Sequence, residues 1–315
     1  MSRYEDIRLA VFGDYMWDQW LEPAEIGMVP SQAAMDYKSP FTIVEKPGGA
    51  GNQVMNVLSL GGKCAAYGIW GDYENPPYYG QKMIDTILDA GGRNRFSSDL
   101  GFTTHFKRYY EYKGTLLHRI SNHDGVYSEE MILKMAEYFG DNISKYDGLI
   151  IADYNKGSMY PTVIRSLMHL CNDVGIPVFV DPKFDNWKSY AGCTVFKPNQ
   201  AEWEASNPGD FWNKPPYTLY ENIAITQGGE GIWLYAKIEN DFDEYYIPVI
   251  STEVYDINGA GDCVMAAMAL EYIKTDGDIL KAAHVGNIAG GICVGHKYTY
   301  CVTEEDLRKA GAWDE

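Results

Sequence analysis

Short apolar runs alternate with amphipathic stretches along most of this chain. Six runs have the length and composition of buried strands: Ile7–Phe12, Cys64–Ile69, Gly148–Ala152, Pro177–Val180, Thr194–Phe196 and Ile223–Thr226. Helical patterns fall between several of them, at Ala50–Leu60, Tyr79–Ala90, Glu129–Phe139 and Thr162–Val174. This alternation predicts an α/β fold with a doubly wound, mostly parallel sheet and helices on both faces.

Two stretches break the alternation. Residues Met28–Val44 are extended and rich in turn formers, and Thr103–Ser121 alternates around Lys113-Gly114 like a β-hairpin. We therefore predict a single domain over residues 1–315, with a small inserted β lid made from residues of about 26–45 and 103–121.

Charge and composition exclude several classes of protein. The formal net charge of −18 argues against general binding to nucleic acid or anionic lipid. The six cysteines form no Cys-x-x-Cys pair and the six histidines show no metal-ligand spacing, so neither a structural zinc nor a disulfide framework is expected. The polar first eight residues and the lack of a membrane-length apolar run predict a cytoplasmic protein without a membrane partner.

Polar residues recur where the predicted strands end. In open α/β sheets ligands bind beyond the carboxyl ends of the strands, so these residues should converge on one cleft. They are Gly13-Asp14, Asp153, Asp181, Lys197-Pro198-Asn199 and Thr226.

The most informative of the local motifs is Gly259-Ala260-Gly261-Asp262, which opens the apolar helical stretch Cys263–Ile273. Unpaired N–H groups and the positive end of the helix dipole can hold a phosphate there. Asp262 could accept a proton from a hydroxyl attacking that phosphate. The plain alternative is an ordinary helix start with an acidic residue in its first turn.

Three further motifs have both a chemical and a plain interpretation. The loop Pro47–Asn52 can bring backbone close to a small ligand, or simply cap a helix. Asn199 and Glu202 share a helical face and can hold waters around Mg²⁺, or form an N-terminal capping box, and both can hold at once. The turn Thr226–Gly231 can contact nucleotide phosphates, or serve only as a glycine-rich hairpin turn.

Several cations lie near the predicted cleft. Because the chain is so acidic, Lys and Arg residues gathered there are candidates for binding a substrate phosphate, although surface ion pairs are the alternative for each. They are Lys107, Arg108 and Arg119 in the lid, and Lys156 and Lys183 after strands.

These motifs, in this order, resemble the PfkB/ribokinase family of carbohydrate kinases over about Leu9 to Leu307. The resemblance rests on Gly48-Gly49 through Asn52, Asn199 with Glu202, Thr226 with Gly228 and Gly231, and the Gly259–Asp262 turn. Within the family, the chain is most similar to the kinases that phosphorylate D-glycero-D-manno-heptose 7-phosphate at its anomeric hydroxyl. That similarity rests on runs such as Val11–Asp18, Lys46–Asn56, Asp153–Gly157 and Val180–Lys183.

The resemblance implies a ribokinase-like fold, an ATP- and Mg²⁺-dependent kinase, and a homodimer formed through the lid. It implies Asp262 as general base, with the N–H groups of Gly259, Ala260 and Gly261 as anion hole. Asn199 and Glu202 would organise Mg²⁺ through water. The implied substrate-binding residues are Asp14, Asp18, Gly48, Gly49, Asn52, Lys107, Arg108, Arg119 and Lys156. The implied nucleotide-binding residues are Lys183, Asn199, Thr226, Gly228, Gly231 and Asn287.

The sequence departs from the heptose kinases in three places. Asn258 replaces their usual Thr, Pro30–Met35 does not match their proline-rich run, and Ala205–Glu221 is short and rich in Pro and aromatic residues where a helix is expected. Three functions therefore compete. The first is a heptose 7-phosphate kinase giving the 1,7-bisphosphate. The second is a kinase of the same fold for ribose, fructose or a nucleoside, and the third is a catalytically silent regulator that binds sugar or nucleotide.

Overall fold

A long central sheet organises the chain in the computed structural model, which describes residues 2–29, 34–71, 78–99, 101–122, 127–183, 186–206, 219–238, 241–250 and 254–313. The sheet has nine strands. Neighbours from β6 to β13 pair in parallel, and β13–β14 and β14–β15 are antiparallel. In spatial order they are β15 (Asp241–Pro248), β14 (Gly231–Ile238), β13 (Asn222–Thr226), β12 (Val195–Phe196), β11 (Val178–Asp181), β10 (Gly148–Ala152), β1 (Arg8–Gly13), β4 (Lys63–Tyr67) and β6 (Arg93–Asn94).

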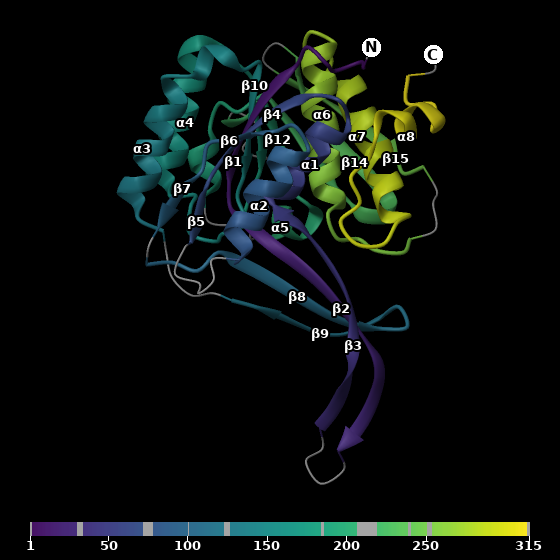
Figure 1. Cartoon of the computed structure of the whole chain (residues 1–315). Helices are drawn as coiled ribbons and strands as arrows, with labels where there is room; N and C mark the ends of the chain where they lie inside the picture. The colour runs from purple at the N-terminus through teal and green to yellow at the C-terminus, as the bar shows by residue number, and fades with distance from the viewer. Residues whose placement is uncertain are drawn as a thin grey trace.

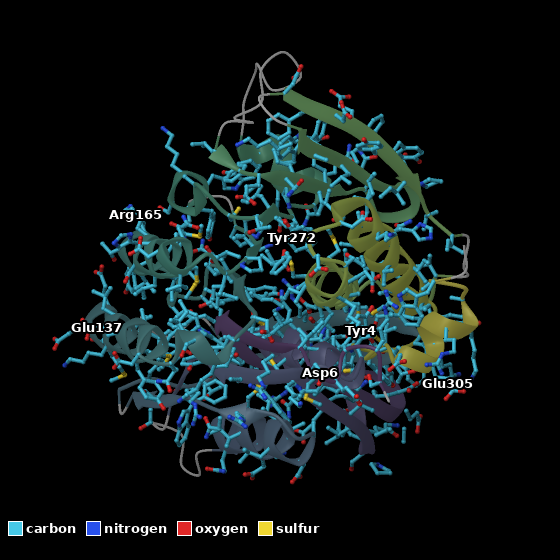
Figure 2. All side chains as sticks on the ribbon, turned by 90° about the horizontal axis from the view of Figure 1, so that it is seen from above. Tyr4, Asp6, Glu137, Arg165, Tyr272 and Glu305 are labelled. Atoms are coloured by element: carbon cyan, nitrogen blue, oxygen red, sulfur yellow. The ribbon has the colours of Figure 1, made fainter. Side chains whose placement is uncertain are left out.

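Helices cover both faces of this sheet, because each buried strand is apolar on both sides. On β1, Leu9 and Val11 belong to one core, whereas Ala10 and Phe12 belong to the other. The first core is packed against α1 (Ala50–Ser59), α2 (Tyr78–Asp89), α6 (Ala260–Lys274), α7 (Ile279–Val294) and α8 (Glu304–Lys309). The second is packed against α3 (Glu129–Gly140), α4 (Pro161–Val174) and α5 (Gln200–Ser206). Seen from above, side chains fill the space between the sheet and both helix layers (Figure 2). The predicted mostly parallel α/β fold is confirmed.

A second sheet projects from the body (Figure 1). It consists of β3 (Ala34–Gly49), β2 (Tyr15–Val29), β8 (His105–Tyr112) and β9 (Thr115–Ser121), in that order. Its strands cover most of the described residues of the two predicted lid segments, and it is larger than predicted, because β2 already begins at Tyr15. A short pair, β5 (Ile69–Gly71) with β7 (Ser97–Asp99), completes the strands of the described residues.

Some sequence predictions fall outside the described residues. Residues 30–33 of the departure at Pro30–Met35, and residues 207–218 of the segment Ala205–Glu221, are among them. In the part of the chain that the structure describes, no helix is long and apolar enough to cross a bilayer.

Candidate active site

The candidate site is a cleft between the carboxyl ends of the parallel strands, the start of α6 and the lid sheet. Its volume is about 580 Å³. Asp262, Asp18, Lys107 and Thr226 all line it, although they come from α6, β2, β8 and β13. The predicted convergence of strand ends on one cleft therefore holds for Asp181, Lys197, Asn199 and Thr226.

The start of α6 is shaped by glycine. Gly259, the N-cap, has φ of 82°, a left-handed conformation that glycine adopts without strain. A Cβ atom at this position would lie 2.7 Å from the Asn52 side-chain nitrogen, so the close approach also requires glycine. Because the N-cap has no side chain, no side chain caps the first turn of α6. The Ala260 N–H donates to the Ile257 carbonyl at 3.4 Å, and the N–H groups that follow it are left for a ligand in the cleft.

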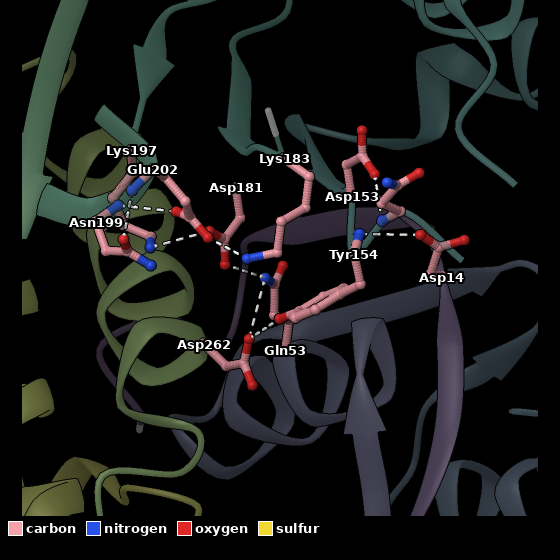
Figure 3. A network of polar contacts seen from close by, with 11 residues as sticks. Asp14, Gln53, Asp153, Tyr154, Asp181, Lys183, Lys197, Asn199, Glu202 and Asp262 are labelled. Carbon is pink, nitrogen blue, oxygen red and sulfur yellow. Dashed lines mark hydrogen bonds and ion pairs between the residues drawn. The ribbon is translucent and has the colours of Figure 1, made fainter. Parts of the chain in front are cut away.

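Asp262, in the first turn of α6, is held by three donors. Its Oδ2 accepts a hydrogen bond of 2.7 Å from Asn52 Nδ2, and its Oδ1 accepts one of 3.3 Å from Gln53 Nε2. The Tyr154 hydroxyl donates a further, short hydrogen bond to Oδ1 (Figure 3). Burial raises the pKa of Asp262 above its usual range, and the hydrogen bonds from Tyr154 and Asn52 oppose that rise. A carboxylate with a raised pKa is suited to accepting a proton.

A buried lysine lies beside the same turn. Lys197 is only 2% exposed, and its Nζ is 3.1 Å from Asp181 Oδ1. The same Nζ would be 3.4 Å from a Cβ atom on Gly261, so its charge faces the start of α6. Gln53 links this pair to the base, because its Nε2 also donates to Asp181 Oδ2 at 3.0 Å. The sequence motifs indicate no role for Gln53, and they mark Lys197 only as part of the strand end Lys197-Pro198-Asn199.

Asn199 and Glu202 form the N-terminal capping box, which is one of the two interpretations of their spacing in the sequence. The Glu202 carboxylate accepts from the Asn199 backbone N–H at 2.9 Å, and Asn199 Oδ1 accepts from the Glu202 N–H at 2.8 Å. The other Glu202 oxygen pairs with Lys183. Both capping residues line the cleft. No group of three or more His, Cys, Asp or Glu side chains gathers for a metal among the described residues, so this donor set fits Mg²⁺ held through water rather than in a protein cage.

The turn between β13 and β14 forms the cleft wall away from the lid. Gly228 and Gly229 line the cleft, and a Cβ atom on either would meet nothing within 4 Å. Gly231 is different, since a Cβ atom there would lie 2.1 Å from the carbonyl oxygen of Ile247. Asn287 of α7 also lines the cleft, and its Nδ2 donates a hydrogen bond of 2.7 Å to the Pro248 carbonyl.

Asp18 is the acidic residue on the lid side of the cleft. It is 4% exposed, and its Oδ1 has no hydrogen-bond partner within the described residues. Gly48 allows this carboxylate to approach the backbone, because a Cβ atom there would be 2.4 Å from Asp18 Oδ2. Burial raises the pKa of Asp18 to about 6, which Lys107 partly opposes. Gly49, which lines the cleft with a φ of 57°, leads directly into α1. A buried acceptor without a partner beside a cleft is suited to a ligand hydroxyl.

The cations of the lid divide between its two faces. Lys107 lines the cleft, and its neighbour Arg108 lies on the opposite face, because successive strand residues alternate. Arg108 donates there to Gln19 Oε1 at 2.9 Å and to the Tyr79 hydroxyl at 3.1 Å. The prediction that Arg108 binds a substrate phosphate is therefore wrong.

Two other cations lie around Lys107. Burial lowers the pKa of Lys156, and the positive charges of Lys107 and Arg119 lower it further. Arg119, exposed on β9, also acts on Asp18. These three cations therefore share one region at the lid end of the cleft, although only Lys107 is among its lining residues.

Two predicted sugar ligands have other tasks in the structure. Asp14 is fully buried, and its carboxylate accepts hydrogen bonds from the backbone of Tyr154, Lys156 and Ser158 and from the Ser158 hydroxyl. It anchors the loop after β10 and does not reach the cleft (Figure 3). Asn52 is 1% exposed and holds Asp262. Neither side chain is placed to contact a sugar directly.

Comparison with known proteins agrees with this arrangement. The sequence profile described as pfkB family carbohydrate kinase matches residues 6–305. The chain belongs to this family. Among curated relatives, the bifunctional protein HldE of Coxiella burnetii is 27% identical over 98% of this chain and 65% of its own length. HldE of Geotalea uraniireducens is 26% identical over 97% of this chain and 63% of its own length. The chain thus spans less than two thirds of the relatives it matches.

Solved structures of kinases share the fold. Phosphofructokinase-2 from Escherichia coli, in complex with substrates and products, superposes with a TM-score of 0.77 at 15% identity, over 98% of this chain and 99% of that one. A microbiome-derived acarbose kinase, Mak1, superposes with a TM-score of 0.70 at 18% identity, over 96% and 98% of the two chains. The chain is a sugar kinase of the pfkB family, and kinases of this family use ATP with a divalent metal.

Proposed function

We propose that this kinase transfers the γ-phosphoryl group of ATP to the anomeric hydroxyl of D-glycero-D-manno-heptose 7-phosphate, giving the 1,7-bisphosphate. The observation that carries the proposal is the joint placement of Asp262, Asp18 and Lys107 around one cleft. It offers a base, an acceptor for a sugar hydroxyl and a cation for the phosphate that the sugar already carries. The similarity to the HldE proteins supports the choice of heptose among phosphorylated sugars.

The residues have distinct tasks in this reaction. Asp262 accepts the proton of the sugar hydroxyl as the oxygen bonds to the γ-phosphorus and the bond to the bridging oxygen of ADP breaks. The N–H groups at the start of α6 and the Lys197 ammonium, which faces that turn, stabilise the charge on the transferred group. Asp18 accepts from another hydroxyl of the sugar and, with Gly48 and Gly49, fixes its orientation.

The nucleotide occupies the other arm of the cleft. Gly228 and Gly229 leave room for phosphates against the backbone, with Thr226, Gly231 and Asn287 beside them. Glu202 and Asn199 lie at the same end and would hold the waters of Mg²⁺, which would neutralise phosphate charge. Lys183, which pairs with Glu202, would lie beside the nucleotide phosphates.

The test is ADP release over a panel of acceptors. We expect the heptose 7-phosphate to be used with a kcat/KM at least tenfold above that of the unphosphorylated heptose. Lys107→Met should remove most of that preference while changing turnover of the unphosphorylated sugar little. Arg108→Met, on the opposite face of the same strand, is the matched control. Equal use of both sugars, or a preference for ribose, fructose or a nucleoside, would contradict the substrate assignment. Absence of ATP consumption with every acceptor would favour a silent regulator.

We also propose that two copies associate through the lid sheet. Direct strand pairs place Gln19, Arg108 and Ile120 on the face opposite Lys107, and Ile43 shares that face, two residues from the partner of Gln19. Ile43 is 54% exposed and Ile120 is 44% exposed. Exposed apolar side chains on one sheet face are suited to burial against a second copy.

A further inference from the structure

Only one of the three donors to Asp262 belongs to the cleft wall. Asn52 and Gln53 are buried in α1 behind the base, and neither lines the cleft. Tyr154, in the loop after β10, does line it, and its hydroxyl donates to Asp262 Oδ1, so this donor comes from the cleft wall (the contact is drawn in Figure 3). An acceptor hydroxyl has to approach the base from that same side. The phenol therefore occupies the cleft-side position on Oδ1.

The position of Tyr154 is fixed at its backbone end. Its backbone N–H donates a hydrogen bond of 2.9 Å to Asp14 Oδ2, and this bond is one of the set that anchors the loop. Two cations of the cleft lie close to the ring. Lys107 Nζ is 5.8 Å and Lys183 Nζ is 6.0 Å from the ring centroid. Cations at this range from an aromatic ring are attracted to it. Tyr154 thus contacts the base and lies beside both the sugar-side and the nucleotide-side cations.

The Oδ1 atom of Asp262 has no remaining capacity for another donor. Oδ1 accepts from Tyr154 and Gln53, and Oδ2 accepts from Asn52. A carboxylate oxygen offers two lone pairs, so on Oδ1 both are in use. The residue is 7% exposed, and a new hydroxyl or a water can reach Oδ1 only by replacing a donor. The replaceable donor is the one on the cleft side.

We propose that Tyr154 is a positioning residue that keeps the base in a resting state. Its hydroxyl occupies the site of the acceptor hydroxyl on Asp262, yields it when the sugar binds, and otherwise keeps water from being activated against ATP. This inference rests on the proposed kinase function, but it does not depend on which sugar is the acceptor.

The charges at the site are consistent with this role. Burial, and then the negative charge of Asp262, raises the pKa of Tyr154 well above its usual value, so the phenol keeps its proton and remains a donor. The hydrogen bond in turn lowers the pKa of Asp262 against the effect of burial. Removing the phenol oxygen should therefore both open the cleft side of the base and raise its pKa.

The direct experiment uses Tyr154→Phe with MgATP and no sugar. We expect the rate of ADP release to rise about tenfold or more, since water can then occupy the vacated place on Asp262. The double variant with Asp262→Asn should lose that increase. Tyr160→Phe is the matched control, because Tyr160 lies in the same segment but donates 2.9 Å to the Tyr127 carbonyl, away from the base. Thermal midpoints of both variants establish that each is folded.

A second measurement tests whether the Tyr154 hydroxyl competes with the sugar for Asp262 or instead helps to bind the sugar. Calorimetric titration with D-glycero-D-manno-heptose 7-phosphate in the absence of nucleotide should show tighter binding to Tyr154→Phe than to the native chain. The acid limb of kcat/KM against pH should move to higher pH in the variant, because the bond that lowers the pKa of Asp262 is gone. A merely structural tyrosine would leave that limb in place.

The outcomes are distinguishable. If Tyr154→Phe binds the sugar more weakly and its sugar-free ADP release does not rise, Tyr154 is a substrate ligand and the inference is wrong. If the native chain turns over no acceptor and Asp262→Asn changes nothing, the kinase function itself fails. If acceptor turnover is intact but the variant shows neither faster hydrolysis nor a shifted acid limb, only the resting-state role is overturned.

Discussion

The buried aspartates of the site differ in what surrounds their oxygen atoms, and this difference sorts their roles. Asp14 accepts four hydrogen bonds from one loop and is a structural anchor. Asp181 pairs with Lys197 and Gln53. Asp18 has one buried oxygen without a partner among the described residues. Asp262 has a hydrogen-bond donor on its cleft side, Tyr154, that we propose is exchangeable. Satisfied carboxylates hold the fold, and the other two are left for ligands.

Asp262→Asn tests the proposed base. The amide cannot accept the proton of the attacking hydroxyl, so kcat should fall on the order of 100-fold or more while ATP binding persists. In the native chain the raised pKa of Asp262 means that kcat/KM falls with acidification at a pH above the usual range of an aspartate. Steady-state kinetics and ATP-induced thermal shifts measure these effects. Near-native turnover in the variant would contradict the mechanism.

Asp18→Asn should trade function for stability. The pKa of Asp18 is about 6 in the folded state, which is higher than its value in the unfolded state. Ionisation of Asp18 therefore lowers the stability of the folded protein, and this loss develops as the pH rises from about 4 to 6 and remains at higher pH. We expect the variant to gain on the order of 2 kcal/mol in unfolding free energy at pH 7.5 and nothing at pH 3.5. Urea unfolding at the two pH values measures this. Equal gains at both would mean that burial of the charge is not the cause.

At the scale of elements, the glycines of the β13–β14 turn should respond in opposite ways. A Cβ atom on Gly229 meets no atom within 4 Å, so Gly229→Ala should keep its thermal midpoint and raise the KM for ATP, since the methyl group enters the cleft. Gly231 has φ of 111° and no room beside Ile247, so Gly231→Ala should lower the midpoint by several degrees. Thermal melting with ATP kinetics distinguishes them, and a stable Gly231→Ala would refute the steric argument.

Elements that are buried on both faces could be predicted from the sequence, and half-exposed ones could not. The strand Gly148–Ala152 was predicted with the bounds that the structure shows, because a short continuous apolar run is typical of a central parallel strand. Strand β2 begins at Tyr15, eleven residues before the predicted lid segment at 26, and its polar positions, Pro23 and Gly27 obscure the pattern.

The site was predictable as motifs, but not as side-chain directions. The strand-end pattern predicted that Asn199 and Thr226 lie at one cleft, and the family resemblance added Asp262, Glu202 and the turns at Gly228 and Gly259. All of these residues line the cleft in the structure. Lys107 and Arg108 are adjacent on β8, so their side chains lie on opposite faces of the sheet, and only Lys107 lines the cleft. Asp14 and Asp18 look equivalent in the sequence, and only the fold of the loop after β10 shows which of them is satisfied.

At the scale of the whole molecule, the proposed dimer would link catalysis to assembly through the lid sheet. Its inner face carries Asp18 and Lys107 into the cleft, while its outer face exposes Ile43 and Ile120. A second copy covering the outer face would hold the sheet in one position and thereby fix the sugar-side residues. A monomer would leave a projecting, partly apolar sheet in water, which is unfavourable.

Ile43→Lys with Ile120→Lys tests this coupling. Two lysines at the proposed contact would have to be desolvated on association, so the double variant should be monomeric where the native chain is dimeric in sedimentation experiments. The KM for the sugar should rise more than the KM for ATP, because only the sugar-side residues lie on the lid. Leu88→Lys is the control, since Leu88 is 48% exposed on α2, outside the lid. A native chain that sediments as a monomer with full activity would exclude the dimer, and a monomeric variant with unchanged sugar KM would separate assembly from catalysis.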